Sequence, residues 1–336
     1  MSDRADQAAE TAPTPRPGGE ELPSIDLLII DRATPRDGRP GDDWLRDRLQ
    51  RLLDDALPPA LRDDRFDGWT APADLILALA LDGDRPIGYL GGAVDRGRVQ
   101  LDGLLAADRA EGIEGAVLAA ALYRAVEPSL TTADAATVEL WGRPAAGWHR
   151  ALADRNGFDD HRALHQMRCG LPIDADPVPS RPFVPGQDEH RLLTVNNRAF
   201  ADHPDQGGMT IDDLRAASTR PWFDPDGIRL HDDPDDPDRL AGFCWTKIHQ
   251  PLADDQPALG EIYAIGVDPD HHGKGLGVPM TAAGLTWLAG QGLTTGMLYV
   301  EADNHPAIRT YEKLGFDRHR TDRAWSKRLS GGGDGR

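Results

Sequence analysis

A glycine-rich turn at residues 271–277 (HHGKGLG) is the feature of this sequence with the clearest chemical meaning. An apolar, β-prone segment at 261–267 precedes it, and a helical run at 278–291 follows it. In this order the first N–H groups of the helix are free to bind an anion, and the helix dipole adds roughly half a positive charge there. Gly275 and Gly277 let a pyrophosphate approach the backbone closely, and Lys274 can add a charge. The turn therefore predicts a phosphate site, against the alternative of a tight turn whose glycines serve packing alone.

The turn differs from two other phosphate-binding motifs. No Gly-Lys-Ser/Thr follows at the spacing of a Walker loop. Val278 stands where the dinucleotide-binding fingerprint requires its last glycine. The sequence thus indicates a phosphate site of another kind.

Metal chemistry is not expected. Residues 270–272 (DHH) lack a third ligand at a suitable spacing, and the acidic run 232–238 lacks the glycine and glutamate of an EF-hand. Cys169 and Cys244 are too few for a disulfide framework or a metal cluster, so each is predicted to be a buried thiol.

The charge balance excludes whole classes of partner. The chain has 336 residues, 56 of them acidic and 37 basic, for a formal net charge of −19. Such a surface repels nucleic-acid phosphates and anionic membranes, and no apolar stretch approaches the roughly 20 residues that span a bilayer. Residues 1–22 lack the apolar core of a signal peptide, so we expect a disordered leader on a cytoplasmic monomer with no nucleic-acid or membrane partner.

The second half predicts alternating strands and helices. Strands are expected at 239–249, 261–267, 295–301 and 318–327, and helices at 278–291 and 304–314. Asn304-His305-Pro306 has the form of a helix cap with proline in the first turn, and Gly315-Phe316 ends that helix. The acidic run 232–238 is expected as a hairpin loop.

The first half repeats this order more faintly. Its pattern predicts strands at 75–81, 86–94, 99–105 and 136–141, and helices at 112–126 and 148–156. Gly157-Phe158 precedes Gly315-Phe316 by 158 residues, and Gly112 precedes Gly275 by 163. Two offsets so similar indicate an internal duplication, with the proline-rich residues 172–185 as the linker.

Taken together, these motifs resemble the GNAT superfamily of acyl-CoA N-acetyltransferases. The pattern consists of Val267-x-Pro269, His272-x-x-Gly275-x-Gly277 and Asn304-x-x-Ala307-x-x-x-Tyr311-x-x-x-Gly315-Phe316. The chain departs from it at His272, where the superfamily usually has Arg or Gln.

A longer resemblance, over most of residues 183–325, is to the mycothiol synthase family of tandem GNAT proteins. It is carried by residues 195–200, 203–208, 222–227, 242–247 and 298–304, whereas in the first half only Asp67-Gly68 and the general layout match. This resemblance implies an α/β fold of two tandem GNAT domains, each a mixed, mostly antiparallel sheet flanked by helices. The expected parts are a leader (1–22), a degenerate GNAT-like domain (23–171), a linker (172–185), a catalytic domain (186–329) and a flexible tail (330–336).

The family transfers acetyl from acetyl-CoA to the cysteinyl amine of a glucosaminyl-inositol. Neither cysteine lies in the CoA motifs as an acyl carrier, so we expect direct attack in a ternary complex. The resemblance assigns Glu261 as the candidate base and Tyr311 as the acid that protonates the departing thiolate. The residues implied to hold acetyl-CoA are Ile265, Gly266, Val267, His272, Gly273, Lys274, Gly275, Leu276, Gly277, Val278, Asn304, His305, Pro306, Ala307, Ile308 and Arg309.

The resemblance also assigns substrate contacts. Lys247, Tyr299 and Glu261 match family positions that reach the amine substrate, and Asp205 and Asp74 stand where the family tends to have glutamate.

In the first half, Glu114 replaces a phosphate-facing glycine, and the offset from Tyr311 leads to Ala153. A carboxylate there would repel pyrophosphate, so this half is expected to be catalytically silent.

Two other functions fit the same motifs. One is acetylation of a different amine, such as an aminoglycoside or a peptide N-terminus. The other is a non-catalytic acyl-CoA-binding sensor, which the presence of both Glu261 and Tyr311 argues against.

Overall fold

The structure is a computed structural model, and it describes residues 25–31, 41–57, 72–95, 97–133, 135–201, 207–251 and 257–329. Within these residues twelve strands form one sheet, in the spatial order β1 (Ile25–Asp31), β2 (Ile76–Asp82), β3 (Arg85–Asp95), β4 (Arg98–Leu105), β5 (Thr137–Gly142), β12 (Asp317–Arg328), β6 (Asp159–Gly170), β11 (Thr295–Glu301), β10 (Leu259–Val267), β9 (Leu240–His249), β8 (Ile228–Asp232) and β7 (Arg181–Pro182). Of the neighbouring pairs in the described sheet, β4–β5 and β10–β11 alone are parallel. The expected mixed, mostly antiparallel α/β architecture is thus confirmed.

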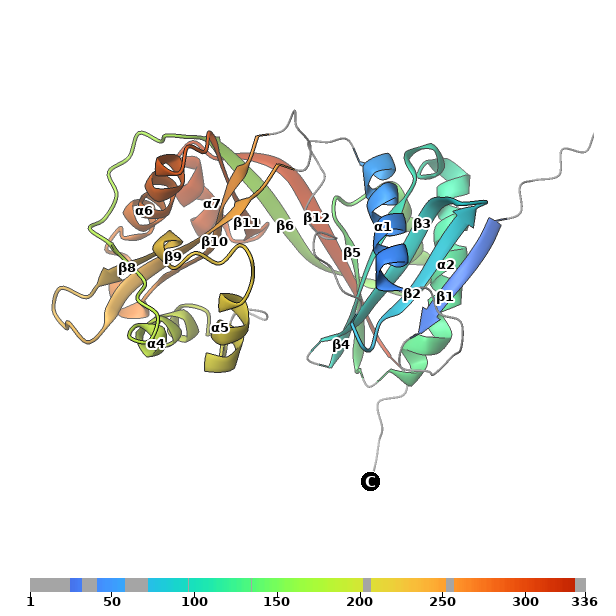
Figure 1. Ribbon diagram of the computed structural model, residues 1–336, viewed down its shortest axis with the longest axis horizontal. Coiled ribbons are helices and arrows are strands. Elements are labelled where there is room, and N and C mark those ends of the chain that lie inside the picture. Colours follow the sequence, from blue (N-terminus) through green and yellow to red (C-terminus); the bar gives the residue numbers. More distant parts are fainter. Residues whose placement is uncertain are drawn as a thin grey trace, which may run out of the picture.

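Helices cover this sheet in two lobes (Figure 1). The first lobe carries α1 (Asp42–Ala56), α2 (Gly112–Thr132) and α3 (Gly147–Arg155), and the second carries α4 (Glu189–Ala199), α5 (Ile211–Ser218), α6 (Gly277–Gly290) and α7 (His305–Glu312). Short 3-10 turns occur at η2 (Ala107–Arg109), η3 (Pro225–Gly227) and η4 (Pro269–His271). Across the described ranges, no helix is both long and apolar enough to cross a lipid bilayer.

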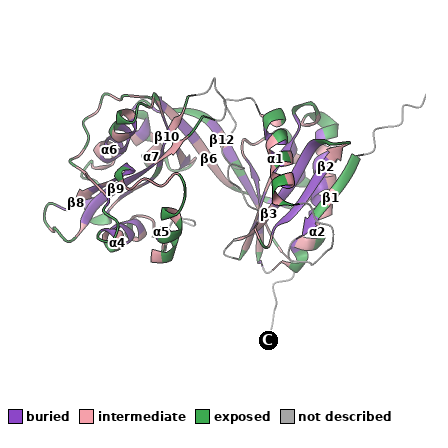
Figure 2. Cartoon of the chain, in the orientation of Figure 1, coloured by how far each residue is buried: buried purple, intermediate pink, exposed green. Residues whose placement is uncertain are grey.

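Opposite faces of the second-lobe sheet form two separate cores. Cys244 and Ile262 pack with residues of α6 and α7, whereas Phe243 and Trp245 pack with residues of α4. Because successive strand residues point to opposite faces, one β9 segment supplies both cores. Figure 2 shows β2 and β9 largely buried, whereas β1, at the edge of the sheet, is mostly exposed.

Most of the predicted elements are present within one or two residues of their expected ends. The principal additions are α1, α4, α5 and β6, which were not predicted. Their sequences are rich in polar residues, and β6 (DDHRALHQMRCG) shows no regular apolar alternation. Tertiary contacts, rather than local preference, place β6 in the middle of the sheet.

The two lobes exchange their last strands. β6, at the end of the first half, pairs with β11 of the second lobe, and β12, at the end of the chain, pairs with β5 of the first. Trp325 on β12 is buried in the first core, and Met167 on β6 is buried in the second. The expected division at residue 171 remains a prediction about domains, but strand pairing crosses it in both directions.

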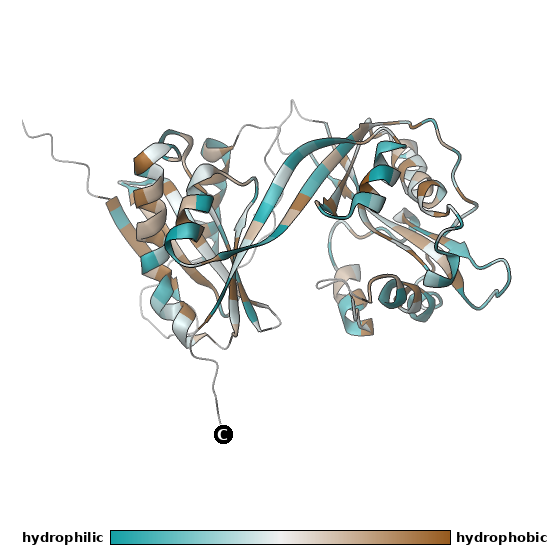
Figure 3. Cartoon of the chain, turned by 180° about the vertical axis from the view of Figure 1, so that it is seen from behind, coloured by the Kyte–Doolittle hydropathy of each residue, from teal (hydrophilic) through white to brown (hydrophobic). Residues whose placement is uncertain are grey.

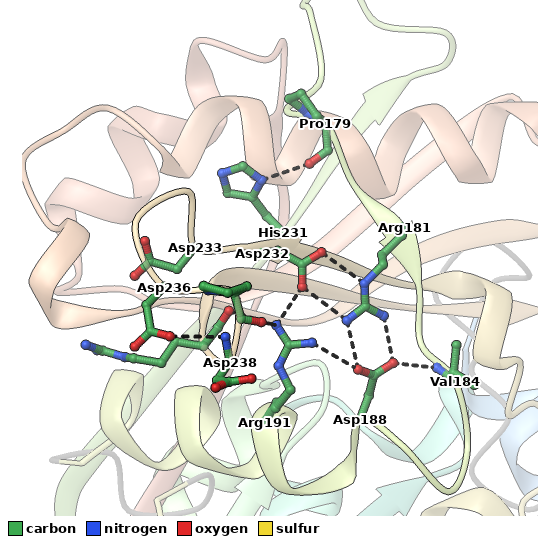
Figure 4. Close-up of polar contacts among 12 residues, drawn as sticks. Pro179, Arg181, Val184, Asp188, Arg191, His231, Asp232, Asp233, Asp236 and Asp238 are labelled. Carbon is green, nitrogen blue, oxygen red and sulfur yellow. Dashed lines mark hydrogen bonds and ion pairs between the residues drawn. The ribbon is translucent and has the colours of Figure 1, made fainter.

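A half-buried ionic cluster, centred on the buried carboxylate of Asp188, joins the linker strand β7 to the second lobe (Figure 4). Arg181 donates to both carboxylate oxygens of Asp188, at 2.7 and 2.8 Å, and also to Asp232. Asp188 also accepts from the backbone N–H of Val184 at 2.8 Å. The hydrogen bonds from Arg181 are the largest cause that holds the pKa of Asp188 below its usual value. The cluster joins β7, β8 and α4 through charge-assisted hydrogen bonds.

Asp188→Asn should lower the free energy of unfolding at pH 7 by about 2 kcal/mol, since it weakens bonds between charged groups in a buried site. A lowered pKa contributes stability above the unfolded-state value, near 3.9, and that contribution is lost as the pH falls through the folded-state value. In denaturant titrations the difference in unfolding free energy between the variant and the native chain should therefore persist down to about pH 4, and it should disappear only as the pH falls through the lowered folded-state pKa. Asp212→Asn, which removes an exposed ion pair with Arg215, is the control and should change stability little. Equal losses in both variants would contradict this role.

Candidate functional site

The parallel strands β10 and β11 separate midway along their length. They pair from Gly260 with Gly296 to Ile262 with Leu298, and a register shift on the β9 side then leaves Tyr263 as an extra residue in β10. β10 continues to Val267 and β11 to Glu301 without further pairing between them. Beyond the bulge, the facing backbone groups of these two strands are available to a ligand.

A cavity of about 240 Å³ lies at this separation. Its lining comes from β10, β11, β6, α4 and the start of α7, and consists of Arg162, Leu164, Phe200, Ile262, Tyr263, Ala264, Ile265, Leu298, Tyr299, Val300, Glu301, Asn304, Ala307 and Tyr311. The lining thus includes five of the residues assigned from the sequence: Ile265, Tyr299, Asn304, Ala307 and Tyr311. Glu261 itself is not part of the lining, but its neighbour Ile262 is.

The glycine-rich turn leads from η4 into α6. Gly273 and Gly275 have φ of 77° and 78°, in the left-handed region that L side chains rarely adopt, and a Cβ at either position would meet open space. The first turn of α6 has no side-chain cap, so its N–H groups remain available to an anion. Lys274 is exposed beside them. The His272 ring instead lies 3.1 Å from the carbonyl oxygen of Val267, so it donates to the end of β10.

Glu261 is buried on β10 and is joined by a residue that the sequence did not single out. His249 Nε2 lies 2.7 Å from Glu261 Oε2. Lys247 faces Glu261 directly across the β9–β10 pair, and its Nζ lies 5.3 Å from the centre of the Trp222 ring. The alternation of β9 places Lys247 and His249 on one face, and that spacing is the signal that could have revealed the histidine.

Tyr311 is buried on α7 and lines the cavity. Burial is the main cause that raises the pKa of its hydroxyl to about 12. The side-chain oxygen of Asn304 accepts from the N–H of Ala307 at 3.2 Å, so Asn304 caps α7 and lines the cavity at the same time.

Tyr299 is held by two further residues that sequence reasoning missed. Its hydroxyl accepts from Gln166 Nε2 at 2.7 Å and from Arg320 at 3.0 Å. Burial raises the pKa of this hydroxyl, and the negative charges of Asp322 and Glu261 act in the same direction. Ile262 and Tyr263, the residues that follow Glu261 on β10, line the cavity, so Glu261 lies next to the cavity wall.

Among the predicted substrate residues that the structure describes, Tyr299 lines this cavity, whereas Lys247, Glu261 and Asp74 do not. Asp74 lies in the first lobe, where its carboxylate accepts from the N–H of Val94 at 3.1 Å, and it does not line the cavity. Asp205 lies outside the described residues.

The first lobe has the corresponding pair of parallel strands, β4 and β5, and these two strands pair over a longer stretch than β10 and β11. β4 and β5 pair in parallel from Arg98 with Thr137 to Asp102 with Trp141, without a register shift. Glu114 lies in the first turn of α2, and Ala153 is fully buried. These features agree with the expectation of a silent lobe, which remains a prediction.

Comparisons with known proteins identify similar sequences and similar folds. The model of the acetyltransferase (GNAT) family matches residues 194–316. The chain is 46% identical over 195 residues to a mycothiol acetyltransferase of Kocuria rhizophila, covering 55% of this chain and 64% of that protein. It is 43% identical over 227 residues to a mycothiol acetyltransferase of Stackebrandtia nassauensis, covering 66% of this chain and 71% of that protein. A tandem GNAT protein from the clavulanic acid biosynthesis pathway has a similar fold, with a TM-score of 0.59 and 18% identity over 91% of this chain and 99% of that one.

Gly275→Ala should weaken the binding of CoA about tenfold in calorimetric titration. A side chain in the left-handed region costs about 1–2 kcal/mol, which the turn can relieve by moving its N–H groups out of place. Gly290→Ala, at the far end of α6 where φ is ordinary and a Cβ meets open space, is the control and should bind CoA normally. Native affinity in Gly275→Ala would show that the turn does not hold the phosphates.

Proposed function

The chain belongs to the mycothiol acetyltransferase family of GNAT proteins, and from this membership we propose that it transfers acetyl from acetyl-CoA to the cysteinyl amine of 1D-myo-inositol 2-(L-cysteinylamino)-2-deoxy-glucopyranoside, the last step of mycothiol synthesis. The observation that carries the proposal is the opening between β10 and β11, with Tyr311 lining it and Glu261 beside it.

In this proposal acetyl-CoA binds to the second lobe, from the glycine-rich turn at residues 273–278 to the opening between β10 and β11. The pyrophosphate lies on the N–H groups of residues 273–278, where positive-φ glycines and the uncapped α6 terminus favour an anion. The pantetheine arm enters between the separated strands and bonds to the backbone of residues 265–267. The thioester then reaches the cavity next to Tyr311. Residues 304–309 lie along the same arm in this proposal, and of these Asn304 and Ala307 line the cavity.

The substrate amine enters from the face of β10 that carries Glu261 and Lys247. Glu261 takes the ammonium proton, directly or through water, while its bond with His249 fixes the orientation of the carboxylate. The free amine attacks the thioester carbonyl, and a backbone N–H of β10 stabilises the resulting oxyanion. The C–S bond then breaks, the thiolate of CoA takes a proton from Tyr311, and the amine nitrogen loses its second proton to solvent.

The raised pKa of Tyr311 suits this role because the leaving thiolate is buried as well. A phenol with a pKa of about 12 is a weak acid towards a thiol in water, whose pKa is about 8.5. Burial also raises the pKa of thiols in this lobe, to about 12 for Cys244 and about 11 for Cys169. In this proposal the same desolvation acts on the leaving thiolate, and it raises the pKa of that thiol in the same direction as the pKa of Tyr311.

The assay that tests the function combines the purified protein with acetyl-CoA and the cysteinyl substrate, and detects the acetylated product by mass spectrometry. An aminoglycoside and a peptide with a free N-terminus serve as competing amines. Faster acetylation of the cysteinyl amine supports the proposal. Binding of acetyl-CoA without turnover of that amine would remove the substrate assignment and leave the fold family intact.

Glu261→Gln should lower kcat by about 10²-fold or more, because the amide cannot accept the ammonium proton. The KM for acetyl-CoA should change little, since Glu261 lies away from the phosphate turn. Glu312→Gln, an exposed residue of α7, is the matched control and should keep native kinetics. A change in KM alone would assign Glu261 to binding rather than to proton transfer.

Tyr311→Phe should lower kcat by about 10²-fold while the affinity for acetyl-CoA is retained. A general acid acts only while protonated, and a pKa of about 12 keeps Tyr311 protonated through the neutral and mildly alkaline range. The native enzyme should therefore show no alkaline decline of kcat up to about pH 10. A decline between pH 8 and 9 that disappears in Tyr311→Phe would show that the hydroxyl titrates lower.

A further inference from the structure

The hydroxyl of Tyr299 lies at the end of a row of polar side chains that runs across three strands. Tyr299 on β11 faces Gln166 on β6, and Gln166 in turn faces Arg320 on β12. Gln166 and Arg320 are both buried, and both strands are those that cross between the lobes. Figure 3 shows polar residues recurring along these two bridging strands.

The direction of each hydrogen bond in this row can be assigned. Arg168 donates from Nε to Gln166 Oε1 at 3.0 Å. A guanidinium can only donate, so the amide oxygen of Gln166 must face Arg168 and its NH₂ group must face Tyr299. Arg320 donates to Tyr299 for the same reason, while Asp322 balances its charge with an oxygen 3.2 Å from Arg320 Nε.

Both acceptor positions of the Tyr299 hydroxyl are therefore occupied by donors. Its oxygen accepts at 2.7 Å from Gln166 and at 3.0 Å from Arg320, which leaves its own proton to be donated. Within the described residues, no hydrogen bond from this hydroxyl to a protein acceptor is found. Tyr299 lines the cavity, and burial raises the pKa of the hydroxyl, so the proton is retained at neutral pH.

We propose that Gln166 and Arg320 are positioning residues that fix Tyr299 as a one-way hydrogen-bond donor toward the amine substrate. This inference rests on the proposed function and refines its specificity. The substrate group that meets Tyr299 must carry an acceptor oxygen, such as a sugar or cyclitol hydroxyl. The ammonium group is excluded from that position, because it would need an acceptor that Tyr299 no longer offers. The selection of the amine substrate by Tyr299 thus depends on β6 and β12, the strands exchanged between the lobes, because they carry Gln166 and Arg320.

Gln166→Glu is the variant that tests this arrangement. The carboxylate has the shape of the amide and retains an acceptor for Arg168, but it cannot donate to Tyr299. Tyr299 should then turn its proton toward Glu at position 166, away from the substrate. We expect the KM of the amine substrate to rise about tenfold, because the loss of one hydrogen bond to the substrate, about 1.4 kcal/mol, corresponds to a tenfold change in affinity. The kcat and the KM of acetyl-CoA should stay within about threefold of the native values, and the melting temperature should be retained.

A double-mutant cycle separates positioning from general damage. Tyr299→Phe should raise the amine KM by a similar factor, and Gln166→Glu should add little in the Tyr299→Phe background, because the hydroxyl on which it acts is gone. Arg318→Gln, on the same strand as Arg320 but exposed, is the control and should show native kinetics. Additive effects in the cycle would overturn the proposal.

A spectroscopic measurement decides the contact without any substrate. In protein labelled at the tyrosine Cζ atoms, the Tyr299 signal can be identified among five tyrosines by its loss in Tyr299→Phe. Gln166→Glu should move this signal downfield at pH 7, because the phenol then donates to a carboxylate.

An unmoved signal would overturn the proposal even if the cysteinyl amine is acetylated. A moved signal with an unchanged amine KM would overturn the role in specificity. If the cysteinyl amine is not acetylated at all, the proposed function fails, and the link from Tyr299 to that substrate fails with it, whatever the signal shows.

Discussion

The antiparallel pairing of β6 with β12 is the interaction on which the rest of the structure depends. Each strand leaves the half of the chain that precedes it and completes the sheet of the other half. Trp325 fills the first core and Met167 the second, so the apolar burial of each lobe depends on residues from both halves. The shared strands also join the lobes through backbone hydrogen bonds, which restrict their relative motion more than a side-chain interface would.

The same crossing concentrates buried polar groups at the centre of the sheet. Gln166, Glu261, Arg320 and Asp322 are all buried there, where a polar group without a partner would be costly. The ion pair between Arg320 and Asp322 within β12 and the hydrogen bond from Gln166 on β6 to Tyr299 on β11 offset that cost and hold these side chains in fixed orientations. In such a site the register of the strands decides which side chains are neighbours, and this fixes the direction of each hydrogen bond.

Electrostatic forces act on the two substrates over long range through the net charge and over short range through backbone N–H groups. The net charge of −19 favours an ammonium substrate over long range and disfavours acetyl-CoA. The glycine-rich turn offsets this locally with backbone N–H groups, which carry no side-chain charge and lose no freedom on binding. The proposed reaction uses both effects, one for each of its substrates.

The sequence by itself determined most of the elements and the motifs with local causes: the positive-φ glycines of the turn, the Asn304 cap and the Tyr311 helix follow from short-range spacing. It could not determine which strands become neighbours. His249 meets Glu261 only through the β9–β10 register, and a register shift between Arg318 and Arg320 places Arg320 opposite Gln166. A bulge reverses which face a residue occupies, and it depends on the partner strand rather than on local preference. The tertiary structure alone therefore decided the strand exchange and the environment of Tyr299, because both depend on contacts between residues more than 130 positions apart.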